Sequence, residues 1–304
     1  MKNVFIAALL LATITLAAQC PPSPKQKEQR FTLNDSVISQ KMAILSQHST
    51  IPLQYNGTVR MYIDLYANRR KTQTNQILQR SYAYFPVIEE ALERHHLPNE
   101  LKYFAMVVST LNPRASARNG RKGLWQLNPT MARQLGLIVD DYVNDCFDPE
   151  LASEIACERL TYLFTYYNDW LLAMTAFELG TATMDNVIAK AEGNKDYWTL
   201  RKHLPKEVRG YIPAYMALLY IMNCPGEYGL YPACPIDNWH NTELLPVNDT
   251  LTFEQIQNCV GISVEQLSML NPKYLKKTIP GSPEHTQTIR IPKNNANRFK
   301  ATFN

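Results

Sequence analysis

Glycine is scarce in this chain, and charge of one sign is never concentrated. Only 11 of the 304 residues are glycine, which argues against a collagen-like chain, a glycine-rich sandwich or a dinucleotide-binding protein. Lysine and arginine number 31 against 27 aspartate and glutamate residues, and they are spread along the sequence without a basic run. Nucleic acid is therefore not an expected partner.

Metal-ligand patterns are missing as well. The sequence has no Cys-x-x-Cys pair and no histidine spacing typical of structural zinc, so we expect no metal and no cofactor. Beyond the amino terminus, no stretch reaches the roughly 18 apolar residues that a membrane span needs. Because 45% of the residues are hydrophobic and 19% are charged, we expect a soluble, mostly globular chain of one large domain or two ordinary ones.

The first 18 residues have the layout of a secretory signal. One lysine precedes an apolar run over residues 4–16, and small residues follow, which predicts export to the periplasm or cell envelope. Residues 19–50 are polar and predict an extended N-terminal segment. Cys20 stands where a lipoprotein cysteine could stand, but Gln19 is larger than the residue that normally precedes one. Membrane association, at the outer membrane, is expected only if Cys20 carries lipid.

An even number of cysteines follows the signal, and this permits disulfides in an exported chain. Cys224 and Cys234 flank a segment that contains proline and glycine, and a short loop can bring them together. They form the best candidate pair, although the sequence does not choose among the pairings. The six residues are Cys20, Cys146, Cys157, Cys224, Cys234 and Cys259.

Apolar and aromatic residues recur at helical spacing over residues 51–224. Asp148-Pro149 marks the start of a long helix. A basic loop over residues 114–122 turns at Asn119-Gly120. The expected helices cover residues 60–70, 76–94, 99–111, 129–135, 148–167, 171–179, 184–191 and 205–224.

The pattern changes after residue 224. Residues 225–242 have the proline and glycine content of a linker. Residues 243–304 then predict strand, helix, helix, strand and a C-terminal tail, with the four elements at residues 244–247, 253–260, 264–270 and 288–291. The predicted fold class is mainly α: a helical domain followed by a small α+β module of βααβ order.

Five motifs follow one another in the helical domain. They are LPNELKYFAMVVSTLNPRA at 97–115, GLWQLNP at 123–129, DW at 169–170, AFELG at 176–180 and LPKEVRGYIPA at 204–214. In order and spacing, residues 51–223 resemble the membrane-bound lytic murein transglycosylase D type of the lysozyme-like, soluble lytic transglycosylase superfamily. The resemblance implies a lysozyme-like helical fold with a cleft for the glycan strands of peptidoglycan. It also implies cleavage beside N-acetylmuramic acid by one glutamic acid that gives and then accepts a proton.

The catalytic motif departs from the family's pattern. The family has Glu-Ser-x-Leu-Asn-Pro, and residues 108–113 here read Val-Ser-Thr-Leu-Asn-Pro. The sequence on both sides matches in register, so Val108 occupies the position of the acid and cannot transfer a proton. Glu100 lies about two helical turns away and is no substitute. We therefore expect no catalytic residue at this position and a pseudoenzyme.

A second cleft motif is altered too. The family's Ala-Tyr-Asn-x-Gly reads Ala-Phe-Glu-Leu-Gly over residues 176–180. Phe177 lacks the hydroxyl that the resemblance assigns to orienting the acid or the N-acetyl group. Glu178 is either a relocated catalytic carboxylate or a polar residue that hydrogen-bonds nearby backbone at a helix end, and we favour the second interpretation.

The resemblance assigns substrate contacts to Ser109, Gln126, Phe177 and Glu178. For Ser109 and Gln126, the alternative is hydrogen bonding to backbone inside the fold. Trp125 is expected in the core rather than against a sugar. The cations of the basic loop either meet anionic muramyl peptides or are solvated, and we favour solvation; they are Arg114, Arg118, Arg121 and Lys122.

The C-terminal segment resembles a LysM domain, a βααβ module that grips N-acetylglucosamine along peptidoglycan or chitin. The resemblance rests on VNDTL at 247–251, ISVEQL at 262–267, NP at 271–272, PG at 280–281 and IRIP at 289–292. Asn248 replaces the usual glycine, and residues 282–287 form an insertion. The alternative is a degenerate module that only packs against the helical domain.

These observations predict an exported peptidoglycan-binding protein, built on a lytic transglycosylase scaffold that has lost its catalytic acid. One alternative is an active lytic transglycosylase that uses another carboxylate, such as Glu178. Another is a cell-envelope interaction protein that no longer binds glycan. The expected partners are peptidoglycan glycan strands and, under the last alternative, other cell-envelope proteins.

Overall fold

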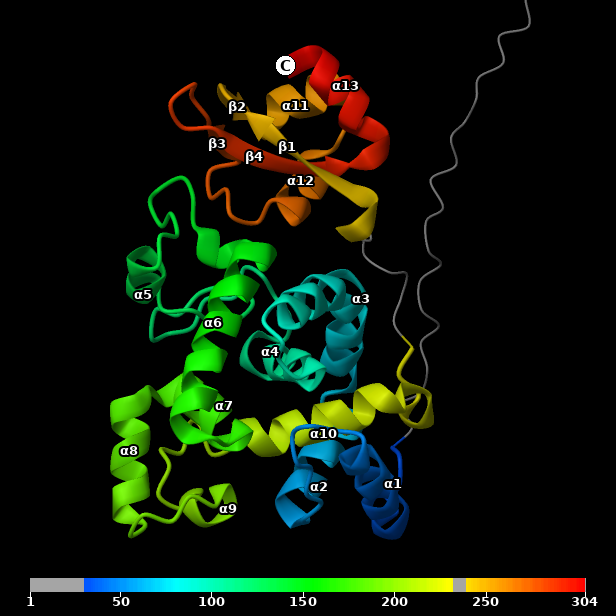
Figure 1. Ribbon diagram of the computed structural model, residues 1–304. Coiled ribbons are helices and arrows are strands. Elements are labelled where there is room, and N and C mark those ends of the chain that lie inside the picture. Colours follow the sequence, from blue (N-terminus) through cyan, green and yellow to red (C-terminus); the bar gives the residue numbers. More distant parts are fainter. Residues whose placement is uncertain (1–29, 232–238, 304) are drawn as a thin grey trace, which may run out of the picture.

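The computed structural model describes residues 30–231 and 239–303. Within them, helices make up the first part of the chain, and two small antiparallel sheets with helices make up the C-terminal part (Figure 1). Each part has its own hydrophobic core. The predicted fold class is thus confirmed. The predicted signal, Cys20 and Cys234 lie outside the described residues, and the domain boundaries stay predictions.

The segment predicted as extended contains a helix. Helix α1, Asp35–Gln47, begins after Asn34, whose side chain accepts a hydrogen bond from the backbone N–H of Val37. Its two buried residues, Ile38 and Met42, stand four residues apart and join the helical core. One apolar contact per turn is enough to fix this polar helix once it packs, and that corrects the prediction for residues 35–47.

The predicted helices of the helical domain are present, with shifted ends and one addition. The α4 helix stops at Ser109 instead of residue 111, and α10 begins six residues later than predicted. The short α9 was not predicted. The elements are α2, Gly57–Asp64; the π-helical turn η1, Leu65–Arg69; α3, Lys71–Arg94; the 3₁₀ turn η2, Asn99–Leu101; α4, Lys102–Ser109; α5, Pro129–Gln134; the 3₁₀ turn η3, Asp145–Phe147; α6, Pro149–Tyr167; α7, Trp170–Leu179; α8, Thr181–Lys190; α9, Tyr197–Leu200; and α10, Tyr211–Asn223.

The C-terminal module contains the four predicted elements and four more. The additions are a 3₁₀ turn, two short strands and a final helix in place of the predicted tail. The elements are the 3₁₀ turn η5, Trp239–Asn241; β1, Thr242–Val247; β2, Thr250–Thr252; α11, Phe253–Val260; α12, Val264–Leu270; β3, Thr278–Pro280; β4, Gln287–Pro292; and α13, Lys293–Phe303. Strand β1 pairs antiparallel with β4, and β2 pairs antiparallel with β3. Helix α13 covers the module's core with Ala296 and Phe299.

The four cysteines within the described residues are free thiols. Cys146 and Cys157 are buried, and burial raises the pKa of the Cys146 thiol to about 11 and that of Cys157 to about 12. The Cys224 thiol donates a hydrogen bond to the carbonyl of Tyr220, one turn back along α10, at 3.2 Å. The structure thus has Cys224 as a free thiol and does not show the predicted bond to Cys234, which lies outside the described residues.

No helix within residues 30–231 and 239–303 combines the length and the apolar character that a membrane crossing requires.

Candidate functional site

Val108 lies in the last turn of α4, half-buried and packed against the helical core. The helix ends one residue later, and the next two residues, Thr110 and Leu111, have φ angles of 57° and 53°. Non-glycine residues in this left-handed region cost about 1–3 kcal/mol each. The turn is held by Arg80 of α3, whose Nη1 donates to the Thr110 carbonyl at 3.1 Å, and by the complete burial of Leu111.

Two predicted substrate residues direct their donors at backbone. The Ser109 hydroxyl is buried and donates to the Ala105 carbonyl at 3.2 Å. The Gln126 Nε2 donates to the carbonyls of Gly123 and Ala115, at 2.8 and 3.3 Å. This is the backbone bonding that we weighed as the alternative to sugar contact for both residues.

The glycine of the GLWQ motif is dictated by its surroundings. Gly123 has a φ angle of +81°, and a Cβ atom there would stand 1.6 Å from the Cys146 carbonyl oxygen. No side chain fits that space. The next residues turn inward, so that Trp125 is fully buried and its indole N–H donates to the Ser153 hydroxyl at 2.9 Å. The core position predicted for Trp125 is what the structure has.

Phe177 lies in an aromatic group under the altered second motif. Its ring packs edge-on against Phe104 and tilted against Trp125, with centroids 5.7 and 6.4 Å apart. The ring is buried. Phe177 therefore contributes shape and apolar area at the end of α7, and it offers no proton.

Glu178 carries a buried carboxyl group. Its side chain is only 6% exposed, and Oε2 lies 3.4 Å from Nη1 of Arg121. The other oxygen, Oε1, has no hydrogen-bond partner within the described residues. Burial raises the pKa of this carboxyl to about 7, against the lowering effect of Arg121. Burial of Tyr211, and then the nearby charge of Glu178, raises the pKa of the Tyr211 hydroxyl as well.

Arg121 joins three of the four predicted substrate residues. Its guanidinium donates to the carbonyls of Glu178, at 2.7 Å, and Phe177, at 3.4 Å, which lie at the C-terminal end of α7. It also reaches the Gln126 carbonyl at 3.4 Å. A cation at this helix end is favourable because the last carbonyls lack helical partners. We had expected Arg121 to be solvated, and nothing in the loop's composition distinguished it from exposed Arg118.

A cavity of about 270 Å³ opens beside this cluster. Its wall includes Arg121, Gln126, Asn128, Arg159 and Phe177, but no carboxylate-bearing residue. Glu178 itself does not line the cavity, although its chain neighbours Phe177 and Leu179 do. Outside the cavity, Glu100 accepts a hydrogen bond from the backbone N–H of Thr50 at 2.8 Å, which ties its carboxylate to the N-terminal segment.

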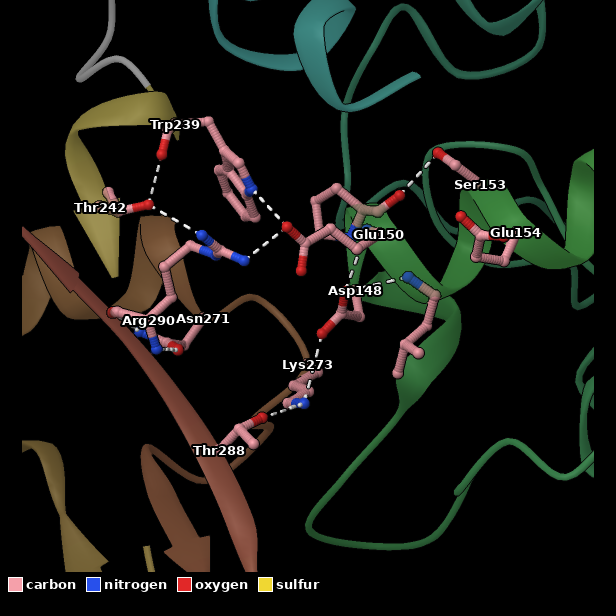
Figure 2. A network of polar contacts seen from close by, with 12 residues as sticks. Asp148, Glu150, Ser153, Glu154, Trp239, Thr242, Asn271, Lys273, Thr288 and Arg290 are labelled. Atoms are coloured by element: carbon pink, nitrogen blue, oxygen red, sulfur yellow. Dashed lines mark hydrogen bonds and ion pairs between the residues drawn. The ribbon is translucent and has the colours of Figure 1, made fainter. Parts of the chain in front are cut away.

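The C-terminal module is docked on the helical domain through a polar network (Figure 2). Oε1 of Glu150, in the first turn of α6, accepts from the Trp239 indole N–H at 3.1 Å and from Arg290 Nη2 at 2.5 Å. The Arg290 guanidinium also lies 4.5 Å from the centre of the Trp239 ring. Its Nη1 donates to the Thr242 hydroxyl at 2.9 Å. Glu150 therefore binds two residues of the module at once.

A second contact lies close by. Lys273 of the module forms an ion pair with Asp148, the N-cap of α6, at 3.3 Å (Figure 2). The two apolar cores also exchange residues. Val143 of the helical domain packs in the module's core and bridges to Tyr274, whereas Leu270 of the module joins the helical core. The sequence carried no signal for these contacts, because none of the residues involved stands in a motif or pattern that distinguishes it from other residues of its type.

Comparison with known proteins adds two domain matches. The profile of the transglycosylase SLT domain matches residues 85–200, and that of the LysM-like domain of lytic transglycosylase MltD matches residues 241–303. Over 241 residues, the chain is 26% identical to the membrane-bound lytic murein transglycosylase D of Escherichia coli strain K12, covering 77% of this chain and 52% of the relative. The protein of that name from E. coli O6:H1 strain CFT073 gives the same values. The chain thus spans about half the length of these curated relatives, and both resemblances predicted from its motifs are confirmed.

Proposed function

We propose that this chain, which combines a transglycosylase SLT domain with an MltD-type LysM-like domain, is an exported peptidoglycan-binding protein without transglycosylase activity. Peptidoglycan is the ligand that suits both domains, because the relatives reported above are named as murein transglycosylases. The same name favours the cell envelope as the location. Since the chain covers only half of those relatives, activity, ligand and location all belong to the proposal.

The observation that carries the proposal is the valine at position 108. Cleavage of a glycosidic bond by this chemistry asks one group to protonate the leaving oxygen and then to accept a proton from the muramyl hydroxyl. Val108 can do neither. The nearest acid in the same motif, Glu100, is bonded to the Thr50 backbone, and Glu178 is buried against Arg121.

Co-sedimentation with purified sacculi tests the binding part of the proposal. We expect the full chain to sediment with murein. Added soluble glycan strands should compete with the sacculi for the protein and lower the sedimented fraction. A chain that stays in the supernatant would favour the alternative of a cell-envelope interaction protein that has lost its glycan site. The E. coli relative serves as the positive control for the murein preparation.

One observation favours a second candidate function, that of an active transglycosylase that uses Glu178. A carboxyl with a pKa of about 7 and 6% exposure has the proton affinity of a general acid. Its absence from the cavity lining and its ion pair with Arg121 argue against that role. If Glu178 were the acid, Glu178→Gln would abolish anhydromuropeptide release, a loss of about 10²–10⁴-fold. Under our proposal, the wild type and Glu178→Gln release the same background amount.

A further inference from the structure

A second cavity lies at the junction between the helical domain and the module, on the side where α12 faces α3 (Figure 1). Its volume is about 380 Å³. We call it the junction groove. Its wall combines α3, the turn that follows α4, η5 and the C-terminal end of α12, so neither domain forms it alone.

Two arginines line the junction groove without an acidic partner. Arg80 uses Nη1 to donate to the carbonyl and hydroxyl of Thr110, at 3.1 and 3.3 Å. Arg114 uses Nη2 to donate to the carbonyl of Tyr274 at 3.0 Å. Within the described residues, no carboxylate lies at ion-pair distance from either guanidinium, and burial lowers the pKa of Arg114.

The other two cations at the junction are neutralised. Arg290 is paired with Glu150, and Lys273 is paired with Asp148. Arg80 is half-buried and Arg114 is exposed. A guanidinium whose partners are only neutral oxygens retains most of its attraction for an anion. The junction groove therefore presents two guanidinium groups that a carboxylate would complete, since each has further N–H donors in a fork that matches carboxylate geometry.

The remaining wall of the groove is apolar. The rings of Tyr84 and Trp239 lie 6.1 Å apart and tilted by 57°, and Met269 at the end of α12 is 50% exposed. Such a wall suits a ligand that carries aliphatic side chains next to its carboxylates. Arg80 also contacts Thr110, two residues after Val108, so the groove adjoins the end of α4 that carries Val108.

We propose that the junction groove binds the carboxylate-bearing peptide substituents of peptidoglycan, with Arg80 and Arg114 as the anion contacts. The proposal rests on the proposed function, because it assumes that glycan strands reach the α4 end. It assigns the module a role in completing a peptide site, in addition to any grip on sugar. An amidase leaves one lactyl carboxylate on each muramic acid of a stripped strand, but this group stands directly on the sugar, whereas the peptide carries its carboxylates next to aliphatic side chains. Only intact strands therefore offer the combination that suits the two arginines and the apolar wall.

The test compares soluble murein strands with the same strands stripped of their peptides by an amidase, using calorimetry on the full chain. We expect the wild type to bind intact strands about 10-fold more tightly than stripped strands, the effect of one or two charge-assisted hydrogen bonds. Arg80→Gln and Arg114→Gln should each lower that ratio about 3-fold or more. Arg114→Gln should keep its affinity for stripped strands within about 2-fold of the wild type. Arg80 also holds the Thr110 turn at the end of α4, so Arg80→Gln is judged by the ratio of intact to stripped binding alone.

A third variant covers the case in which loss of an arginine disturbs the docking. Met269→Glu places a negative charge on the exposed rim of the groove and should lower the ratio of intact to stripped binding as well. Leu244→Glu adds the same charge at an exposed site of β1 outside the groove, and Arg118→Gln removes an exposed cation of the same domain; both should leave the ratio unchanged.

Equal affinity of the wild type for intact and stripped strands would overturn the peptide site and leave the glycan-binding proposal intact. An effect of Arg118→Gln as large as that of Arg80→Gln would overturn it too, because the attraction would then follow overall charge. Binding to neither kind of strand would instead contradict the proposed function itself, and the peptide site would fall with it.

Discussion

At the scale of single residues, the side chains at positions 108 and 177 of the altered motifs are held by packing. Val108 contributes an apolar side chain to the end of α4, and Phe177 contributes a ring to the group of Phe104 and Trp125. Glu178 is the one acid introduced into this neighbourhood by the altered motif, and Arg121 fixes both its backbone carbonyl and its carboxylate. These contacts favour a structural role for Glu178, in which it fixes Arg121 at the end of α7.

The buried carboxyl of Glu178 should make stability depend on pH. Its pKa in the folded state is about 7, above the ordinary value of 4.5, so between these pH values the folded protein binds more protons than the unfolded chain. The free energy of unfolding that this group contributes is highest below about pH 4.5 and falls as the pH rises through 7, by up to about 3 kcal/mol. Urea unfolding from pH 4.5 to 8 measures the fall.

Glu178→Gln provides the comparison, because glutamine has the same shape and does not titrate. We expect this variant to lose the fall and to be more stable than the wild type at pH 8. Glu192→Gln, at an exposed position, should retain the wild-type profile. Parallel profiles for the wild type and Glu178→Gln would show that the carboxyl is not buried in the folded state.

At the scale of elements, helices whose ends are marked in the sequence by capping residues or glycine could be predicted most accurately. Helices α11 and α12 were predicted residue for residue, since Thr252 and Ser263 cap their starts and Gly261 follows the first of them. The four-residue α9 and the three-residue strands β2 and β3 are too short to show any period. Helix α1 was missed because only two of its residues are buried.

In the candidate site too, only residues that stand in motifs could be singled out from the sequence. Gln126, Phe177 and Glu178 belong to such motifs, whereas Arg121 belongs to a loop whose cations look alike. Which cation turns inward depends on the carbonyls at the end of α7, more than 50 residues away in the chain. Local sequence does not contain that information.

Asp148 has two tasks that a pair of variants can separate. Its side chain caps α6 by accepting from the backbone N–H groups of Glu150 and Leu151, at 3.0 and 3.2 Å, and it also pairs with Lys273. Asp148→Asn keeps the cap and loses the ion pair, and Asp148→Ala loses both. We expect the alanine variant to be less stable than the asparagine variant by about 1 kcal/mol, the usual value of a cap.

Thermal unfolding of the two variants measures that difference. Equal stability of Asp148→Asn and Asp148→Ala would mean that the cap contributes nothing and that the ion pair accounts for the whole effect. A variant with the same change at an exposed acid, Asp141→Ala, provides the baseline for surface substitutions.

At the scale of the whole molecule, apolar and ionic contacts dock the module on the helical domain. The exchange of Val143 and Leu270 between the two cores removes apolar surface from water on both sides. Glu150 adds a charge that the buried Arg290 requires. A module docked in this way holds its surface at a fixed place relative to the α4 end, and this is the property on which the junction groove depends.

Docking predicts one cooperative unfolding transition for the wild type. Glu150→Ala leaves Arg290, whose side chain is 10% exposed, without its carboxylate. Because the Glu150 side chain is 37% exposed, water replaces part of the pair, and we expect a loss of about 1–3 kcal/mol. We expect scanning calorimetry to show one transition for the wild type and a separate, earlier transition of the module in this variant.

The matched control is Glu154→Ala on the same helix. Glu154 pairs with Arg94 and His95 inside the helical domain, so its loss should lower the stability without splitting the transition. Two separate transitions already present in the wild type would contradict the docking.

The central claim, that the altered cleft performs no cleavage, is tested most directly by mass spectrometry of the products released from purified sacculi. The wild type is compared with the E. coli relative, with Val108→Glu and with the triple variant Val108→Glu, Phe177→Tyr, Glu178→Asn. We expect the wild type to release no more anhydromuropeptide than buffer. Val108→Glu alone should restore little, because the second motif stays altered, and the triple variant should restore more. Release by the wild type at a rate like that of the relative, abolished by Glu178→Gln, would contradict the claim.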